Sequence, residues 1–117
     1  MGPYSQCVVG EGSKFVFIAG QVPEDSSGNL IGKNDIEAQT RQVLSNLGIA
    51  VAGAGGTVED ICKITIFVVA LDKTAYGVVA RVRQKFFKGD YPASTLVEVS
   101  KLAKTDWLIE IEAYAVI

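Results

Sequence analysis

The chain has 117 residues, of which 49% are hydrophobic and 21% charged, and its net charge is −2; this composition excludes a disordered chain and predicts a single domain, residues 1–117. The lysines and arginines are dispersed, so the basic patch typical of nucleic-acid-binding proteins is absent and we expect no nucleic-acid partner. No apolar run approaches the ~20 residues that a membrane span requires, and no secretory signal is visible, so we expect a cytoplasmic protein without a membrane segment.

The first half of the chain predicts two strands and one long helix. A β-rich run covers residues 15–19, and a polar turn separates it from a short return strand at residues 30–31. Asn34 and Glu37 resemble a capping box, and apolar residues then recur at helical spacing over about 35–52.

A glycine-rich stretch, residues 53–56, follows this helix. Glycine-rich turns can bind phosphate, but a phosphate loop opens a helix and carries a Gly-Lys-Ser/Thr signature, which is missing here. We therefore interpret the stretch as the end of the helix. Thr57 and Asp60 then resemble the cap of a single further turn.

The second half predicts a central strand, a second helix and two further strands. Residues 61–69 have apolar side chains on both faces of the expected strand, which is typical of a central strand buried on both faces. Asp72 caps the second helix and Gly89 ends it. The apolar positions of this helix are Tyr76, Val79, Val82 or Arg83, and Phe86. Alternating patterns over 95–99 and 107–116 predict the last two strands.

The predicted order β-β-α-β-α-β-β describes an α+β fold with one mixed sheet. Two helices cover only one face of such a sheet. Because residues 61–69 are apolar on both sides, a monomer would expose a large apolar patch on the second face. We therefore expect a homo-oligomer.

Proton chemistry in this chain has to use residues other than histidine, because the sequence contains none. Glu110 and Glu112 lie two positions apart on the last strand and point to the same face. They are either solvated carboxylates or, if another subunit covers that face, at least one is buried with a raised pKa. Glu110 is therefore a candidate acid or base.

The two cysteines and the N-terminal segment are weaker candidates. Cys7 and Cys62 form no C-x-x-C pattern, fit a reducing compartment, and are each more typical of a small core residue than of a nucleophile. Residues 2–6 are polar and turn-forming, and a disordered tail is their simplest interpretation.

Several short blocks nevertheless form an ordered set along the chain. They are Gly2-Pro3-Tyr4-Ser5-Gln6, Ala19-Gly20-Gln21-Val22-Pro23, Gln39-Thr40 with Asn46-Leu47, Asp60 through Lys63, Tyr91-Pro92-Ala93, Val97-Glu98-Val99 and Glu110-Ile111-Glu112-Ala113. Together they resemble the signature blocks of the RidA (YjgF) family over residues 2–116. The resemblance implies a chorismate-mutase-like mixed β-sheet with two helices on one face, and a homotrimer whose sheets form a central β-barrel.

The same resemblance implies a chemistry. RidA enzymes hydrolyse reactive 2-enamines and 2-imines to 2-keto acids and ammonia, a form of metabolite damage control. They act in clefts between subunits and use no metal or cofactor. For this chain the resemblance therefore implies a hydrolase of the 2-iminobutanoate/2-iminopropanoate deaminase type, with a small keto or imino acid as ligand. Glu110 corresponds to the family's catalytic glutamate and Tyr4 to a cleft tyrosine.

Three positions depart from the family pattern. Ala19 stands where the family's Ser-Gly-Gln block has serine, and Leu96 stands where the family has a cysteine two residues after its arginine. The arginine that holds the substrate carboxylate in family enzymes corresponds to Ser94 here. Loss of a bidentate anchor costs roughly 2 to 4 kcal/mol, or about 30- to 1,000-fold in rate. The hydroxyls of Ser94 and Thr95 could hold a carboxylate weakly, so both are candidate substrate-binding residues. Lys14, Lys88 and Lys101 are candidate replacements for the missing cation.

Three activities remain open at this point. The first is a deaminase of weakened or altered activity. The second is a non-enzymatic trimer that senses a ligand or docks a partner protein, and the missing arginine favours it. A ribonuclease or translation inhibitor, as some family members are described, is less favoured because the chain is acidic and lacks histidine.

Overall fold

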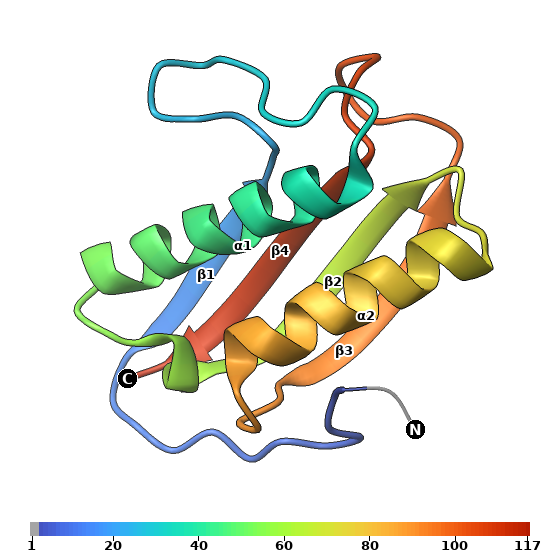
Figure 1. The fold of residues 1–117 in the computed structure, drawn as a ribbon. Coiled ribbons are helices and arrows are strands. Elements are labelled where there is room, and N and C mark those ends of the chain that lie inside the picture. Colours follow the sequence, from blue (N-terminus) through green and yellow to red (C-terminus); the bar gives the residue numbers. More distant parts are fainter. Residues whose placement is uncertain (1–2) are drawn as a thin grey trace.

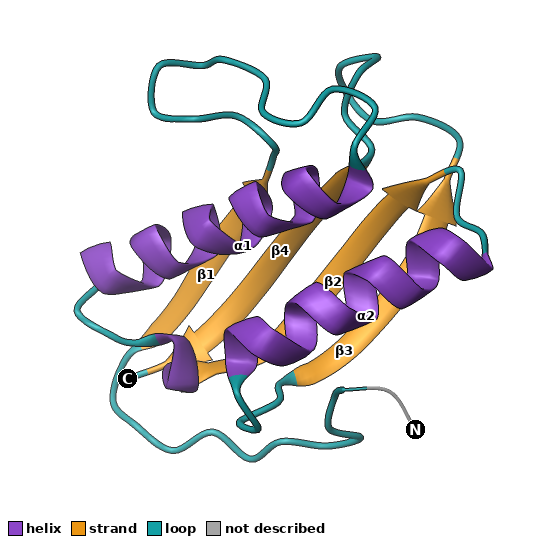
Figure 2. Ribbon diagram, viewed as in Figure 1, coloured by secondary structure: helices purple, strands orange, loops and turns teal. Residues whose placement is uncertain are grey.

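The computed structural model describes residues 3–117 as two helices on one face of a four-stranded sheet (Figures 1 and 2). Its elements are β1 (Phe15–Gln21), α1 (Ile36–Gly53), a 3₁₀ turn (Val58–Asp60), β2 (Ile61–Val69), α2 (Lys73–Phe87), β3 (Ala93–Val99) and β4 (Ile109–Val116). The strand order is β1-β4-β2-β3; β2 runs parallel to β3, and the other two pairs are antiparallel. The mixed α+β sheet predicted from the sequence is confirmed.

The return strand predicted at residues 30–31 does not form. Leu30 makes only an isolated bridge to Glu24. The carboxylate of Asp25 accepts hydrogen bonds from the backbone N–H groups of Ser27 and Asn29, each at 2.9 Å. This Asx-type turn satisfies the backbone locally, so the segment stays a loop and the order is β-α-β-α-β-β.

The helix caps agree with the sequence in part. Asp35, rather than Asn34, caps α1, because its carboxylate accepts a hydrogen bond from Ala38 N at 3.1 Å. Asn34 instead takes a left-handed conformation with φ 60°. The cap predicted at Asn34 is therefore wrong, whereas the capping box of Thr57 and Asp60 is present as predicted.

The core lies between the two helices and the side of the sheet that faces them. The largest fully buried side chains of the sheet are Ile64, Ile66, Val68, Ile109 and Ile111, and those of α1 include Val43, Leu44, Leu47 and Val51. The central place predicted for residues 61–69 is confirmed, since β2 lies between β4 and β3. The predicted burial of this strand on both faces is not confirmed within one chain, because the side chains of β2 that point away from the helices are only partly buried.

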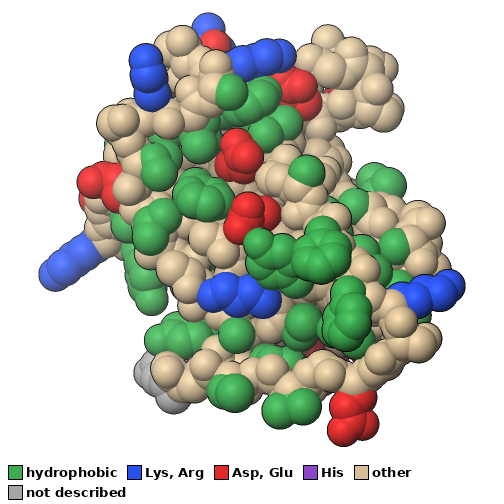
Figure 3. Space-filling model, turned by 180° about the vertical axis from the view of Figure 1, so that it is seen from behind, with side chains coloured by type: hydrophobic (Ala, Val, Ile, Leu, Met, Phe, Trp, Pro, Cys, Tyr) green, Lys and Arg blue, Asp and Glu red, His purple; other side chains and the backbone are tan. Residues whose placement is uncertain are grey.

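Neither α1 nor α2 covers the opposite face of the sheet (Figure 1), and Figure 3, seen from that side, shows hydrophobic side chains with acidic ones among them. On it Phe15 is 71% exposed and Phe17 77%, and the ring of Phe17 contacts that of Tyr114 edge-on, 5.7 Å between centroids. Glu110 and Glu112 share this face with Tyr114, because they alternate with the buried residues of β4. We call this surface the open face.

The N-terminal segment packs against the edge strand β3. Ser5 forms a parallel bridge to Ala93, and its backbone N–H donates to the carbonyl of Pro92 at 3.0 Å. The interpretation as a disordered tail is wrong for residues 3–6, because a strand edge with unpaired backbone groups was available to them; Gly2 lies outside the described residues.

The prediction that Cys7 is a small core residue is also wrong, since Cys7 is exposed. No helix among residues 3–117 is long and apolar enough to cross a membrane.

Candidate functional site

A cavity of about 430 Å³ lies where the N-terminal segment, α2 and β3 meet. Its lining residues are Tyr4, Gln6, Leu71, Tyr76, Arg83, Ser94 and Leu96. Two of the residues singled out in the sequence, Tyr4 and Ser94, therefore come together although they lie near opposite ends of the chain. We call this space the edge cavity.

Ser94 enters the edge cavity because of its register in the sheet. It pairs with Ile64 of β2, and Ile64 is fully buried beneath the helices. Paired residues of neighbouring strands point to the same face, so Ser94 faces α2. There its Oγ accepts a hydrogen bond from Nη1 of Arg83 at 2.8 Å.

Thr95 does not line the edge cavity with Ser94. As the next residue of the strand it points to the open face, where its Oγ1 accepts a hydrogen bond from Nζ of Lys63 at 2.7 Å. Within one chain it therefore lies away from the edge cavity. Lys14, Lys88 and Lys101, the cations considered as replacements for an arginine, do not line the cavity either.

Glu110 also lies on the open face, so a single chain does not bring it together with Tyr4 and Ser94. Its carboxylate packs against the backbone of Gly20 in β1; a Cβ at residue 20 would collide with Glu110 Oε2. Burial and, to a smaller extent, the charge of Glu112 raise the pKa of the Glu110 carboxyl. A carboxyl with a raised pKa exchanges protons closer to neutral pH than an ordinary glutamate.

Arg83 is the cavity residue that the sequence pattern concealed. It occupies a core-facing position of α2 and is only 2% exposed. Its Cζ lies 5.7 Å from the centre of the Tyr4 ring, and its Nε has no hydrogen-bond partner among residues 3–117. Burial lowers the pKa of its guanidinium. In the sequence, Arg83 is a charged residue at a position where the helical period predicts an apolar one, and this pattern could have identified it.

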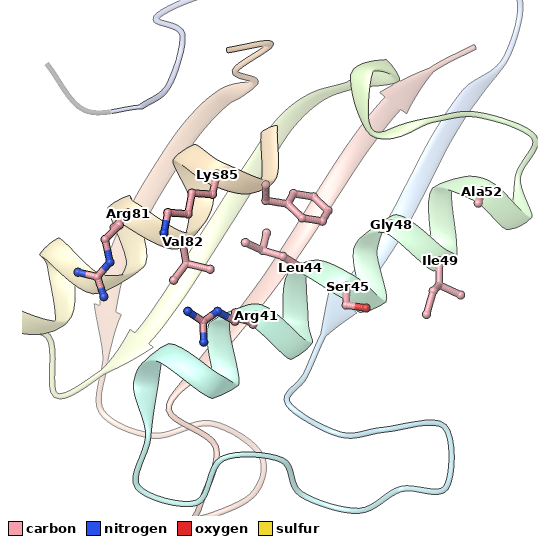
Figure 4. A pocket seen from close by; sticks show the side chains of 10 residues that line it. Arg41, Leu44, Ser45, Gly48, Ile49, Ala52, Arg81, Val82 and Lys85 are labelled. Atoms are coloured by element: carbon pink, nitrogen blue, oxygen red, sulfur yellow. The ribbon is translucent and has the colours of Figure 1, made fainter. Parts of the chain in front are cut away.

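A second cavity, of about 510 Å³, lies between α1 and α2 (Figure 4). Leu44, Val82 and Phe86 form its apolar part. Arg41 and Arg81 stand at its rim, and both form ion pairs with Glu37. None of the described residues that line this cavity is a carboxylate, so it offers no acid or base of the kind that Glu110 provides. Among residues 3–117 no cluster of side chains could hold a metal ion.

Comparison with known proteins assigns the chain to a family. The model of the Endoribonuclease L-PSP family matches residues 1–117. A RutC family protein of Pyrococcus horikoshii is 42% identical over 115 residues, which cover 98% of this chain and 87% of the relative. YyfB of Yersinia pestis, from the conserved Rid family, has a crystal structure similar to this one with a TM-score of 0.92 at 34% identity, covering 98% of this chain and 87% of YyfB.

A further solved relative contains a ligand. TdcF of Escherichia coli, crystallised with bound serine, is similar to this structure with a TM-score of 0.80 at 35% identity. The match covers 100% of this chain and 90% of TdcF. The full-length family match, the relatives and the shared arrangement of two helices on a mixed sheet together show that the chain belongs to the YjgF/RidA family, whose family model is described as Endoribonuclease L-PSP.

Proposed function

We propose that this protein binds 2-imino and 2-keto acids in clefts between the subunits of a homotrimer and hydrolyses the imines to keto acids and ammonia. The observation that carries the proposal is Glu110, a carboxylate on the open face whose pKa is raised and whose position depends on Gly20. The position of Tyr4 and Ser94 at the edge cavity provides the second half of the proposed cleft.

The exposed aromatic residues support the trimer. Phe15 and Phe17 are 71% and 77% exposed, and Tyr114 and Val97 add to the same apolar surface. A soluble monomer rarely leaves such a surface in water. In addition, Glu110 and Ser94 face opposite sides of one sheet, so a cleft that uses both has to combine Glu110 of one subunit with Ser94 of a neighbour.

The proposed reaction needs one group that accepts and returns a proton. A water molecule adds to the carbon of the protonated imine while the Glu110 carboxylate accepts a proton from that water, giving a neutral carbinolamine. Glu110 then returns this proton to the amino nitrogen. As the carbon–nitrogen bond breaks and ammonia leaves, the Glu110 carboxylate accepts the hydroxyl proton and the keto group forms; ammonia takes up that proton and restores the carboxylate. The raised pKa of Glu110 suits both transfers, since it brings proton exchange by the carboxyl closer to neutral pH than in an ordinary glutamate.

The choice of a carboxylate ligand draws support from TdcF. That relative was solved with bound serine, which carries a carboxylate and a nitrogen on the same carbon. A 2-imino acid of the same length shares this arrangement. We therefore propose that the present protein also binds ligands of this class, in which a carboxylate lies beside the reacting carbon.

The test compares two glutamates of the open face. Ammonia release from freshly generated 2-aminoacrylate is measured for the wild type, Glu110→Gln and Glu112→Gln. General-base catalysis predicts a loss of about 100- to 10,000-fold for Glu110→Gln, and a far smaller change for Glu112→Gln. Equal losses in both variants, or full activity in Glu110→Gln, would refute the role of Glu110.

Ser94 favours one alternative, a trimer that binds the same metabolites without hydrolysing them. A cleft without the family's strand arginine can serve as a sensor, because sensing needs affinity but no rate acceleration. Thermal unfolding in the presence of keto acids and amino acids distinguishes the two functions when it is combined with the ammonia assay. Stabilisation by these ligands without ammonia release identifies the sensor, and stabilisation with release identifies the hydrolase.

A further inference from the structure

Arg83 is a buried cation without a partner of opposite charge. It is 2% exposed, and no carboxylate among residues 3–117 forms an ion pair with it. The ion pairs of the described residues involve Arg41, Arg81 and Lys104 instead. Arg83 therefore differs from the other arginines of the chain, which are solvent-exposed and paired.

The surroundings of Arg83 offset the burial of its charge only in part. Ser94 accepts one hydrogen bond from Nη1, and the ring of Tyr4 lies at a distance that allows a cation–π contact. Nε remains buried and without a partner among the described residues. A buried charge is normally paired, and a buried polar atom without a hydrogen bond lowers the stability of the fold. An anion from outside the chain would satisfy both the charge of Arg83 and its Nε.

The edge cavity provides the place for such an anion. Its volume of about 430 Å³ is that of a small-molecule site. Its polar lining residues are Tyr4, Gln6, Tyr76, Arg83 and Ser94, and Leu71 with Leu96 forms an apolar wall. A guanidinium binds a carboxylate through two parallel N–H···O bonds, a geometry that a lysine cannot reproduce.

We infer that Arg83 anchors the carboxylate of the ligand in the edge cavity, and that helix α2 thereby supplies the cation that position 94 of β3 lacks. Ser94 is a positioning residue in this arrangement, since its hydroxyl holds Nη1 and thereby orients the guanidinium. The ligand class is a small monocarboxylate whose 2-keto or 2-imino carbon lies beside the carboxylate and whose side chain is apolar and contacts Leu71 and Leu96. The keto or imino group of this ligand is taken from the proposed function, whereas its carboxylate is inferred from Arg83 alone.

The first experiment measures binding of pyruvate and of pyruvamide, its neutral analogue, by calorimetry on the full chain. We expect Arg83→Gln to weaken pyruvate binding by about 30- to 1,000-fold and to leave pyruvamide binding nearly unchanged. Arg83→Lys should recover only part of the affinity, since it restores the charge without the planar fork. Arg81→Gln is the matched control, because Arg81 lies on the same helix, is half-exposed and pairs with Glu37; it should bind pyruvate like the wild type.

A second variant moves the cation rather than removing it. The double substitution Arg83→Gln with Ser94→Arg places a guanidinium on β3 and removes the one on α2. Recovery of pyruvate affinity to within about tenfold of the wild type is the expected result, since a charge-assisted pair depends on the position of the charge and not on the element that carries it. No recovery, in a double variant that sediments like the wild type, would count against a shared anchoring role.

A measurement on the wild type covers the case in which the Arg83 variants do not fold. Titration with pyruvate should shift the ¹⁵N resonance of Arg83 Nε, while that of Arg81 stays in place. An unmoved Arg83 resonance at saturating pyruvate overturns the inference. So does Arg83→Gln that binds pyruvate normally, or Arg83→Gln that dissociates the oligomer while its subunits bind pyruvate normally; the last result assigns Arg83 to subunit pairing.

The outcomes also separate this inference from the proposed function. Pyruvate binding that requires Arg83, together with no ammonia release from imines, leaves the anchor in place and removes the hydrolase. Ammonia release with an unchanged KM in Arg83→Gln removes the anchor and leaves the hydrolase.

Discussion

The guanidinium of Arg83 in α2 donates a hydrogen bond to the hydroxyl of Ser94 in β3, with 2.8 Å between Nη1 and Oγ. This bond joins the second helix to the edge strand and satisfies one donor of a buried cation. Ser94→Ala removes the acceptor and leaves that donor without a partner. We expect a loss of about 1 to 3 kcal/mol in the free energy of unfolding.

Urea unfolding at a fixed protomer concentration measures this loss, because the stability of an oligomer depends on concentration. Ser94→Thr is the control, since it keeps a hydroxyl at the same position and should retain most of the stability. A Ser94→Ala protein as stable as the wild type would show that water replaces the hydroxyl without cost.

Gly20 is the second position with a specific expectation. Gly20→Ala places a methyl group where the Glu110 carboxylate now lies, so the carboxylate has to move. Because the displaced atoms are the far end of a side chain, stability should change little. The rate of imine hydrolysis should fall by up to about 100-fold, as displaced catalytic groups commonly cause.

Gly77→Ala is the matched control for this substitution. Gly77 lies in α2, and apart from its chain neighbours and the backbone of the helix itself, a Cβ there meets no atom of the described residues within 4 Å. Alanine in a helix is more stable than glycine by about 0.5 to 1 kcal/mol, so we expect a small stabilisation and an unchanged hydrolysis rate. If Gly77→Ala reduced the rate as much as Gly20→Ala, displacement of Glu110 would not be the cause.

Glu110 should make the stability of the protein depend on pH. Burial and the charge of Glu112 raise its pKa in the folded state, so its protonated form favours folding. This contribution is fully present below the ordinary pKa of a glutamate and is lost as the pH rises through the raised value. Glu110→Gln cannot ionise and does not lose it.

The difference in unfolding free energy between Glu110→Gln and the wild type should therefore grow in favour of the variant from about pH 4 up through the raised pKa, and level off above it. Denaturation series across this range give the difference. Glu112→Gln should remove only the smaller part of the effect, because burial is the larger cause. Parallel pH profiles for all three proteins would contradict the raised pKa.

Phe17 tests the assembly. Phe17 is 77% exposed, and its ring contacts that of Tyr114 on the open face. Phe17→Glu should convert the proposed trimer into monomers in sedimentation equilibrium at micromolar concentration, because a charge in an apolar interface is strongly unfavourable. Ile49→Glu is the control, as Ile49 is 68% exposed on α1, on the opposite side of the molecule, and should leave the assembly unchanged. A wild type that sediments as a monomer refutes the proposed assembly outright.

The amino-acid sequence by itself determined the elements and the fold class. Apolar residues alternate in strands such as β4 and recur at helical spacing in α1, and these periods follow from local geometry, so they can be read without a structure. The alternation of β4 also identified Glu110 as a candidate, whereas Ser94 was identified only by the resemblance to the RidA family. Prediction from the sequence was wrong where short-range hydrogen bonds competed with a pattern, at the cap of α1 and at residues 30–31.

Only the tertiary structure decided which side chains meet. The parallel register of β3 with β2 directs Ser94 toward α2, while Glu110 of the neighbouring ladder points to the open face. The N-terminal segment then pairs with the edge of β3 and brings Tyr4 over Arg83. A helical period shows which positions face the core, but a partner of Arg83 depends on contacts between residues distant in the chain. For that reason the cation of the edge cavity became visible only in the folded protein.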